Sequence, residues 1–127
     1  MIEENVVKEG DTLIFILRDT MKSEESIELS FENVYQNKNI FVQMFDINKL
    51  MFNVTKHTLV PKHQIMSELD KQSMLKILNL DNPNQFQIIK KNDPVAKYMG
   101  MKTGQACYIY RISPTAGYHL NIRYCEL

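Results

Sequence analysis

The segment Asp93-Pro-Val-Ala-Lys-Tyr-Met-Gly100 marks both ends of one short helix. The Asp93 carboxylate can accept hydrogen bonds from the free N–H groups of a first helical turn, and Pro94 suits the first helical position because no N–H is needed there. Gly100 suits the left-handed residue that ends many helices. We predict a helix of about two turns between Asp93 and Gly100, followed by a turn at Lys102-Thr-Gly104.

The chain that follows this helix has the pattern of a β-hairpin. Gln105–Ile112 and Tyr118–Cys125 are two runs rich in β-branched and aromatic residues. The five residues between them, Ser113-Pro-Thr-Ala-Gly117, include the turn-forming types Ser, Pro and Gly. We predict two antiparallel strands joined by this loop.

The chain that precedes the helix contains an extended segment, His57-Thr-Leu-Val-Pro-Lys-His63. Pro61 has a fixed φ and favours extended backbone at the residue before it, so no helix is expected there. A second helix is predicted between Ser67 and the helix-breaking Asp81-Asn-Pro83. Ser67 can cap its N-terminus, and Asp70, three residues later, can complete the capping pair and favour the positive end of the helix. Its apolar stripe at helical spacing consists of Leu69, Met74, Ile77 and Leu78.

Residues 54–127 are therefore predicted to form an α+β domain, with two short helices and a small sheet that ends in the C-terminal hairpin. Residues 1–53 are predicted to be a small region rich in strands, with a polar loop at Thr20–Ser26. The strands expected in this region are Leu13–Leu17, Ile27–Phe31, Ile40–Met44 and Leu50–Val54.

Acidic and basic residues are unevenly distributed along the chain, although the net charge is zero. Residues 1–53 contain ten acidic and five basic side chains, and residues 54–127 contain five acidic and ten basic ones. This asymmetry supports two units of different character. The basic half has too few Lys and Arg residues for a strong free-standing DNA binder.

The sequence has neither a stretch apolar enough to span a bilayer nor the N-terminal layout of a signal peptide, so we expect a soluble intracellular protein. Cys107 and Cys125 lie in apolar runs, which fits reduced, buried thiols better than a disulfide. With His57 and His63 they make a Cys2His2 set by count, but zinc ligands are usually paired at close spacing. We expect no metal and no cofactor.

No catalytic residue is predicted. The neighbours of Cys107 are Ala106 and Tyr108, which would not activate a thiol. No aspartate cluster has the spacing of a magnesium site. Asp93 is better explained as a helix cap than as a catalytic acid, and His63 either bonds backbone carbonyls or faces a partner.

Several short sequence motifs, in this order and at this spacing, resemble those of a family of small RNA polymerase subunits. The family comprises the fifth, shared subunit of eukaryotic nuclear RNA polymerases, in its C-terminal domain, and the corresponding archaeal subunit. The motifs are His57-x-Leu-Val-Pro-Lys-His63, Asp93-Pro-Val-Ala-Lys-Tyr-x-Gly-x-Lys-x-Gly104, and Arg111-x-Ser-x-Thr-Ala-Gly117 with Arg123. The chain departs from the family pattern at Phe86-Gln87, Thr103, Pro114, Tyr118-His119 and Ile122.

The resemblance implies a non-catalytic subunit that docks on the largest polymerase subunit and contacts other subunits, with downstream DNA nearby. It implies that residues 1–53 are a shortened N-terminal jaw and residues 54–127 the assembly domain. No membrane contact and no obligate homo-oligomer are expected. The location would be the nucleus for a eukaryotic protein, the cytoplasm or virion for a viral one, and the cytoplasm for an archaeal one.

The resemblance also assigns residues to the polymerase interface and near DNA. Lys90 and Lys91 are the candidates for a position close to DNA. The interface candidates are His57, Pro61, Lys62, His63, Asp93, Pro94, Lys97, Tyr98, Gly100, Lys102, Gly104, Arg111, Ser113, Thr115, Gly117 and Arg123.

Two other functions remain open from the sequence. A free-standing nucleic-acid-binding module would use the basic half and would bind with strong salt dependence. A transcription adaptor that reuses the same fold would bind regulators outside the polymerase.

Overall fold

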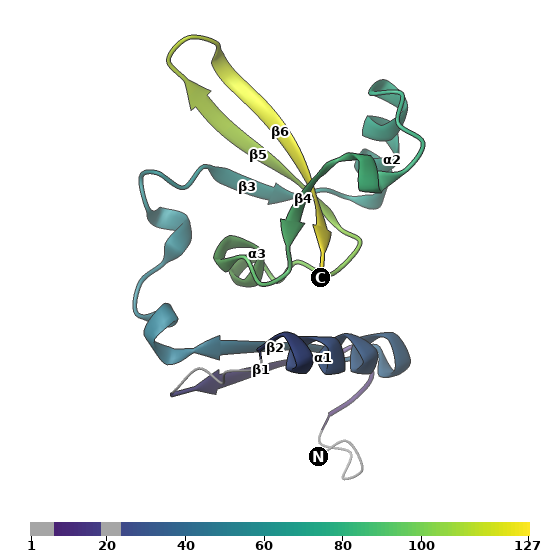
Figure 1. Ribbon diagram of the computed structural model, residues 1–127, viewed down its shortest axis with the longest axis vertical. Coiled ribbons are helices and arrows are strands. Elements are labelled where there is room, and N and C mark those ends of the chain that lie inside the picture. The colour runs from purple at the N-terminus through teal and green to yellow at the C-terminus, as the bar shows by residue number, and fades with distance from the viewer. Residues whose placement is uncertain (1–6, 19–23) are drawn as a thin grey trace. The chain divides into compact units, whose positions relative to one another are not determined.

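A computed structural model describes residues 7–18 and 24–127 (Figure 1). The chain divides into two compact units, Met1–Phe52 and Asn53–Leu127. The identity of the first unit as a shortened jaw stays a prediction. Within the described ranges, no helix has both the length and the apolar character needed to cross a membrane.

The first unit is a β–α–β arrangement. β1 (Thr12–Leu17) and β2 (Phe41–Asp46) pair in parallel, and α1 (Glu24–Lys38) connects them. Parallel strands need such a crossover, because a tight turn cannot bring the chain back to the same end of the sheet. The strands expected at Leu13–Leu17 and Ile40–Met44 are confirmed. The core consists of Val7, Ile40 and Val42, with Leu13, Phe31 and Val34 packed against them.

The strand predicted for Ile27–Phe31 is wrong, because these residues lie in α1. In a five-residue window, Ile27, Leu29 and Phe31 alternate with polar residues, as in a strand. A longer window has Ile27, Phe31 and Val34 at i, i+4 and i+7, the spacing of one helix face, and Leu29 is exposed. Of the loop predicted at Thr20–Ser26, residues 20–23 lie outside the described residues and residues 24–26 belong to α1.

The strand predicted for Leu50–Val54 is also wrong. Two short 3₁₀ helices, η1 (Ile47–Leu50) and η2 (Val54–Lys56), flank this position. The Asp46 carboxylate accepts a hydrogen bond of 2.8 Å from the N–H of Asn48, and the Asn53 side chain accepts one of 3.0 Å from the N–H of Thr55. These local bonds to the backbone compete with strand pairing.

The second unit contains a four-stranded sheet in the order β3–β5–β6–β4. β5 (Ala106–Ser113) and β6 (Gly117–Glu126) form the antiparallel hairpin that the sequence predicts. β3 (Lys62–Ile65) pairs antiparallel with β5, and β4 (Gln87–Lys90), preceded by η3 (Pro83–Gln85), pairs in parallel with β6. The α+β fold class is confirmed, whereas β3 and β4 were not predicted as strands.

The two helices of this unit begin where the sequence predicts. In α2 (Glu68–Ile77), the Ser67 hydroxyl accepts a hydrogen bond of 3.1 Å from the N–H of Asp70. In α3 (Pro94–Met99), Asp93 Oδ1 accepts one of 2.9 Å from the N–H of Val95, and Gly100 ends the helix at φ +66°. The stripe predicted on α2 does not form a core, because Leu69 and Ile77 are 76% and 72% exposed.

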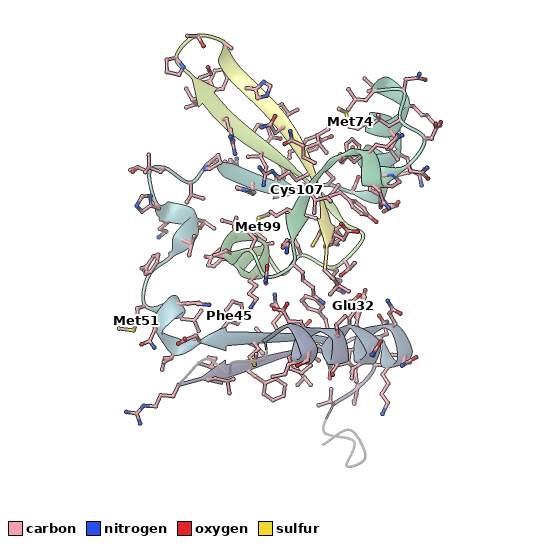
Figure 2. All side chains as sticks on the ribbon, viewed as in Figure 1. Glu32, Phe45, Met51, Met74, Met99 and Cys107 are labelled. Carbon is pink, nitrogen blue, oxygen red and sulfur yellow. The ribbon has the colours of Figure 1, made fainter. Side chains whose placement is uncertain are left out.

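The core of the second unit lies between α3 and one face of the sheet. Cys107, Ile109 and Cys125 from the hairpin pack with other buried residues, namely Ile89, Ala96 and Met101. Figure 2 shows Cys107 within the sheet and Met99, which packs against this core, on α3.

The hairpin is longer than its neighbouring strands. β3 pairs with β5 only as far as Tyr110, and β4 pairs with β6 only from Arg123 onward. Residues 111–122 therefore extend beyond both edge strands, as Figure 1 shows. The predicted interface residues of the hairpin lie mainly in or beside this projecting part.

Candidate functional site

The first candidate segment, His57–His63, begins as a turn and not as the extended backbone that the sequence predicts, and it enters β3 at Lys62. The N–H of Leu59 donates a hydrogen bond of 3.2 Å to His57 Nδ1, and the N–H of Val60 donates one of 3.0 Å to the His57 carbonyl. His63 Nδ1 lies 2.7 Å from the Pro61 carbonyl oxygen. Of the two roles left open for His63, bonding to a backbone carbonyl is the one observed.

The turn at His57–Val60 also limits the sheet. Lys62 is the first residue of β3 and pairs with Tyr110 of β5, and the preceding position would place Pro61 opposite Arg111. The Met66 N–H donates to the Ala106 carbonyl, so the even-numbered residues of this strand direct their backbone groups towards β5 and Pro61 does not. The N–H of Val60, the next one that would face β5, donates to the His57 carbonyl instead, so the ladder does not continue. The segment thus ends the pairing of β5 just before Arg111.

The second segment, Asp93–Gly104, is a capped helix followed by a turn that is anchored to the rest of the unit. The N–H of Met101 donates to the Ala96 carbonyl at 3.0 Å, and the N–H of Gly104 donates to the Cys125 carbonyl at 3.0 Å. Lys102 begins the turn, where its N–H donates to Gln105 Oε1 at 2.9 Å.

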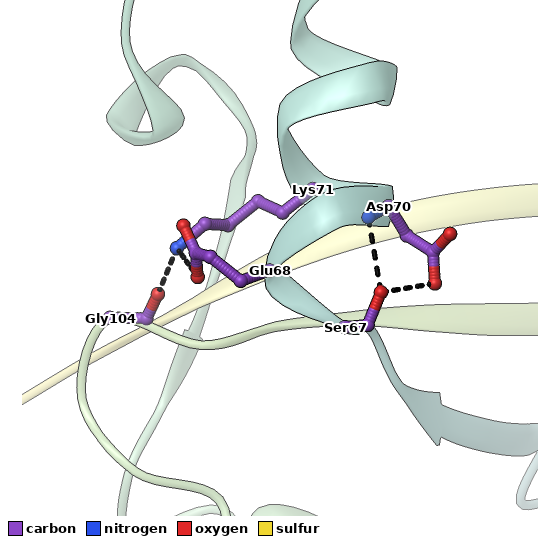
Figure 3. A network of polar contacts seen from close by, with 5 residues as sticks. All are labelled: Ser67, Glu68, Asp70, Lys71 and Gly104. Atoms are coloured by element: carbon purple, nitrogen blue, oxygen red, sulfur yellow. Dashed lines mark hydrogen bonds and ion pairs between the residues drawn. The ribbon is translucent and has the colours of Figure 1, made fainter.

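Figure 3 shows the polar contacts between α2 and this turn. Lys71 Nζ donates a hydrogen bond of 2.9 Å to the Gly104 carbonyl and forms an ion pair of 2.8 Å with Glu68. Ser67 and Asp70 form the cap of the same helix, with the Ser67 hydroxyl 2.7 Å from Asp70 Oδ2. The Gly104 position therefore joins the turn to α2 and to β6.

The residues just before the first segment contact α3. Asn53 Nδ2 donates a hydrogen bond of 2.9 Å to the hydroxyl of Tyr98. Tyr98 is exposed apart from this contact, and Lys97 is half-buried in the same helix. The structure thus brings residues near 53–57 next to the predicted Asp93–Gly104 segment.

In the hairpin, the register separates the candidate residues by face. Arg111 lies directly opposite His119, and Arg123 lies opposite Cys107. Side chains alternate between faces along a strand, so these residues share the face on which Cys107 and Ile109 are buried. We call the polar part of this face the arginine face; it consists of Arg111, His119 and Asn121 in the projecting part and Arg123 next to it.

The opposite side of the hairpin carries large apolar side chains, and from the sequence its tyrosines fit contact with a partner and packing within the sheet equally well. We call it the aromatic face. Its members are Tyr108, Tyr110, Ile112, Tyr118, Leu120 and Ile122, paired across the strands as 108 with 122, 110 with 120 and 112 with 118. Ile112 and Tyr118 are 81% and 87% exposed. In the sequence, large apolar residues occur at alternate positions of each strand. The register places those of both strands side by side, so they form one continuous surface.

The tip of the hairpin is a compact turn. Ser113 Oγ and Thr115 Oγ1 are 3.2 Å apart, and the N–H of Ala116 donates to Ser113 Oγ at 3.3 Å. Gly117 has φ +70°, which favours glycine. Ser113, Thr115 and Gly117 therefore shape the loop, while Arg111 and Arg123 lie further along the strands.

The two lysines suggested to lie near DNA differ in their exposure to solvent. Lys90 is exposed at the end of β4, but Lys91 is only 9% exposed and its N–H donates to the Glu126 carbonyl at 2.8 Å. Lys91 is thus nearly buried and Lys90 is exposed, and a position of either lysine near DNA stays a prediction.

Cys107 is poorly suited to act as a nucleophile. It is fully buried, and burial raises its thiol pKa from 9.0 to about 11, although the positive charge of Arg123 acts in the opposite direction. Cys107 and Cys125 are both free and buried, as predicted. In residues 7–18 and 24–127, no group of three or more His, Cys, Asp or Glu side chains could hold a metal ion.

Comparison with known proteins relates most of the chain to one family. Residues 52–125 match the family model of the RNA polymerase Rpb5 C-terminal domain. Over 75 residues, the chain is 43% identical to the DNA-directed RNA polymerase subunit Rpo5 of Pyrococcus abyssi, which covers 59% of this chain and 90% of the relative.

Eukaryotic relatives match a smaller part of their own length. The DNA-directed RNA polymerases I, II and III subunit rpabc1 of Dictyostelium discoideum is 37% identical over 90 residues, which covers 71% of this chain and 45% of that protein. The DNA-directed RNA polymerases IV and V subunit 5B of Arabidopsis thaliana is 39% identical over 64 residues, covering 50% of this chain and 29% of that protein. The chain thus spans less than half the length of these two relatives.

Proposed function

The chain belongs to the RNA polymerase Rpb5 C-terminal domain family, and on that premise we propose that it is a non-catalytic subunit of a multisubunit DNA-directed RNA polymerase. Its second unit docks on the largest subunit near downstream DNA, contacts other polymerase subunits and supports assembly and transcription. The first unit acts as a shortened jaw.

The observation that best supports docking is the exposed aromatic face. Tyr118, Ile112 and Leu120 are 87%, 81% and 46% exposed, and the register joins them on one side of the projecting hairpin. Contiguous apolar surface of this kind is typical of interaction sites, and tyrosine is enriched in interfaces. A partner that covers this face would remove it from water.

The arginine face supports the same role. Arg111 is exposed, lies opposite His119, and has no carboxylate within ion-pair distance in the described part of the chain. Arginine is among the residues that contribute most to interfaces. The capped segment Asp93–Gly104 and the segment His57–His63, which leads into β3, complete the proposed docking surface.

Arg111→Glu tests the proposal, because it reverses a charge on an exposed side chain and leaves the core intact. Tagged protein purified from its source in moderately high salt should recover the two large polymerase subunits. We expect the variant to recover about tenfold less of them, as for loss of a strong interface residue. Circular dichroism should show an unchanged fold.

Lys76→Glu is the matched control, because Lys76 is an exposed cation in the last turn of α2 and is not a candidate interface residue. It should recover the large subunits normally. Normal recovery by Arg111→Glu would remove this residue from the proposed interface. Recovery of the wild-type chain without any polymerase subunit would overturn the proposed function and favour a separate adaptor.

A further inference from the structure

One edge of the hairpin has no neighbouring strand. β6 runs over Gly117–Glu126, but β4 pairs with it only over Arg123–Glu126. The outer side of residues 117–122 therefore has no strand beside it in the described part of the chain. A free edge of this length is a template for an added strand, unless the sequence protects it.

The backbone groups at this edge can be assigned from the hydrogen bonds nearby. Cys125 uses both its N–H and its C=O towards the start of β5, with distances of 2.8 Å to Gln105 and 3.0 Å to Gly104. The Glu126 carbonyl instead accepts from the N–H of Lys91, beyond the end of β4. Backbone groups alternate in direction along a strand, and the β5–β6 register is unbroken, so Tyr118 and Leu120 direct their N–H and C=O outward.

The side chains next to this edge differ between the two faces. On one face, Tyr118, Leu120 and Ile122 offer apolar contacts. On the other, His119, Asn121 and Arg123 are polar or cationic, and Arg111 lies across from His119. An added strand would therefore have apolar side chains on one face and anionic ones on the other.

The positive charge on this face has no ion-pair partner among the residues that the structure describes. In residues 7–18 and 24–127, neither Arg111 nor Arg123 forms an ion pair. Arg123 Nε is moreover buried and has no hydrogen-bond partner among the described residues. A buried donor without a partner is costly.

We propose that the outer edge of β6 at Tyr118 and Leu120 accepts an extended segment of the largest polymerase subunit as an added strand. This segment alternates apolar side chains, which cover the aromatic face, with Asp or Glu side chains, which pair with Arg111, His119 and Arg123. A protein strand fits better than nucleic acid, because the edge presents alternating N–H and C=O groups and an apolar face. The inference rests on the proposed function and specifies how the docking occurs.

Amide hydrogen exchange tests the added strand. The rates at single residues are measured in the purified chain and in the assembled polymerase. We expect the Tyr118 and Leu120 amides to exchange at least about tenfold more slowly in the assembled enzyme. The His119 and Asn121 amides, which point towards β5, are internal controls and should exchange slowly in both samples.

Carbodiimide coupling tests the acidic residues. The reagent joins a lysine amine to a carboxylate as an amide and takes up the released water. His119→Lys should couple to an Asp or Glu of the largest subunit, identified by mass spectrometry. Native Lys76, exposed on α2, is the comparison and should not couple to that segment.

Three outcomes separate the two proposals. Unchanged exchange at Tyr118 and Leu120 in a polymerase that contains the chain would overturn the added strand and leave the assembly role intact. Failure of the lysine variant to couple, or coupling to a different subunit, would overturn the acidic segment as the occupant. Absence of the chain from the polymerase would overturn the proposed function itself.

Discussion

Cys107 illustrates, at the scale of one residue, how location decides chemistry. A thiol beside an arginine could have a lowered pKa, and the positive charge of Arg123 does act in that direction. Burial has the larger effect and keeps the thiol protonated. The side chain therefore behaves as a small apolar residue in the core formed with Ile109 and Cys125.

This gives a prediction for alkaline pH. The pKa of Cys107 is raised from 9.0 to about 11, so between these values the unfolded chain loses a proton that the folded protein keeps. The free energy of unfolding should be unaffected by this group below pH 9 and should fall as the pH rises from 9 to 11. Urea unfolding of the wild type and Cys107→Ala across this range measures the effect.

The variant should lose less stability with rising pH, because it lacks the titrating thiol. The comparison concerns the slope with pH and not the absolute stability, since removing the sulfur also leaves a small cavity. Equal slopes for the two proteins would contradict the role assigned to Cys107.

At the scale of elements, the helices differ in how far their own sequence defines them. α3 is defined by neighbours in sequence: Asp93 caps it, Pro94 begins it and Gly100 ends it. α1 was mistaken for a strand because Leu29 interrupts its apolar spacing, and its core contacts come from β1 and β2. A short element with strong caps is easier to predict than a longer one whose apolar face needs a partner.

Asp93→Ala should lower the free energy of unfolding by about 1 kcal/mol, the usual contribution of a helix cap. The carboxylate accepts hydrogen bonds of 2.9 Å from Val95 and 3.4 Å from Ala96, and alanine leaves both N–H groups without this acceptor. Urea denaturation measures the change. Asp93→Asn is the control and should lose less, because its amide oxygen can still cap. If the two variants were equally destabilised, the cap would not explain the effect.

At the scale of the whole molecule, the chain forms two units with separate cores. The core of the first contains Val7, Ile40 and Val42. The buried cluster of the second contains residues from Ile89 to Cys125, with Ile65 packed against it. The family match covers residues 52–125, which is nearly the second unit alone. The second unit therefore has the internal contacts that a domain needs to fold by itself.

Residues 53–127 expressed alone should fold and unfold cooperatively. We expect the midpoint of thermal unfolding to stay within a few degrees of the corresponding transition of the full chain, because no core residue is removed. Differential scanning calorimetry of both proteins makes the comparison. Loss of a cooperative transition in the shorter protein would show that the second unit depends on residues 1–52.

The sequence alone determined the features that depend on near neighbours: the caps at Ser67 and Asp93, the left-handed Gly100, the β5–β6 hairpin, the buried thiols and the family resemblance. Tertiary structure decided what depends on residues far apart in the chain. These features are the parallel pairing of β1 with β2 and of β4 with β6, the helical state of α1, the burial of Lys91 and the separation of aromatic and arginine faces. The physical reason is that a cap needs only the adjacent turn, whereas strand pairing and burial depend on which distant segment supplies the other side of the contact.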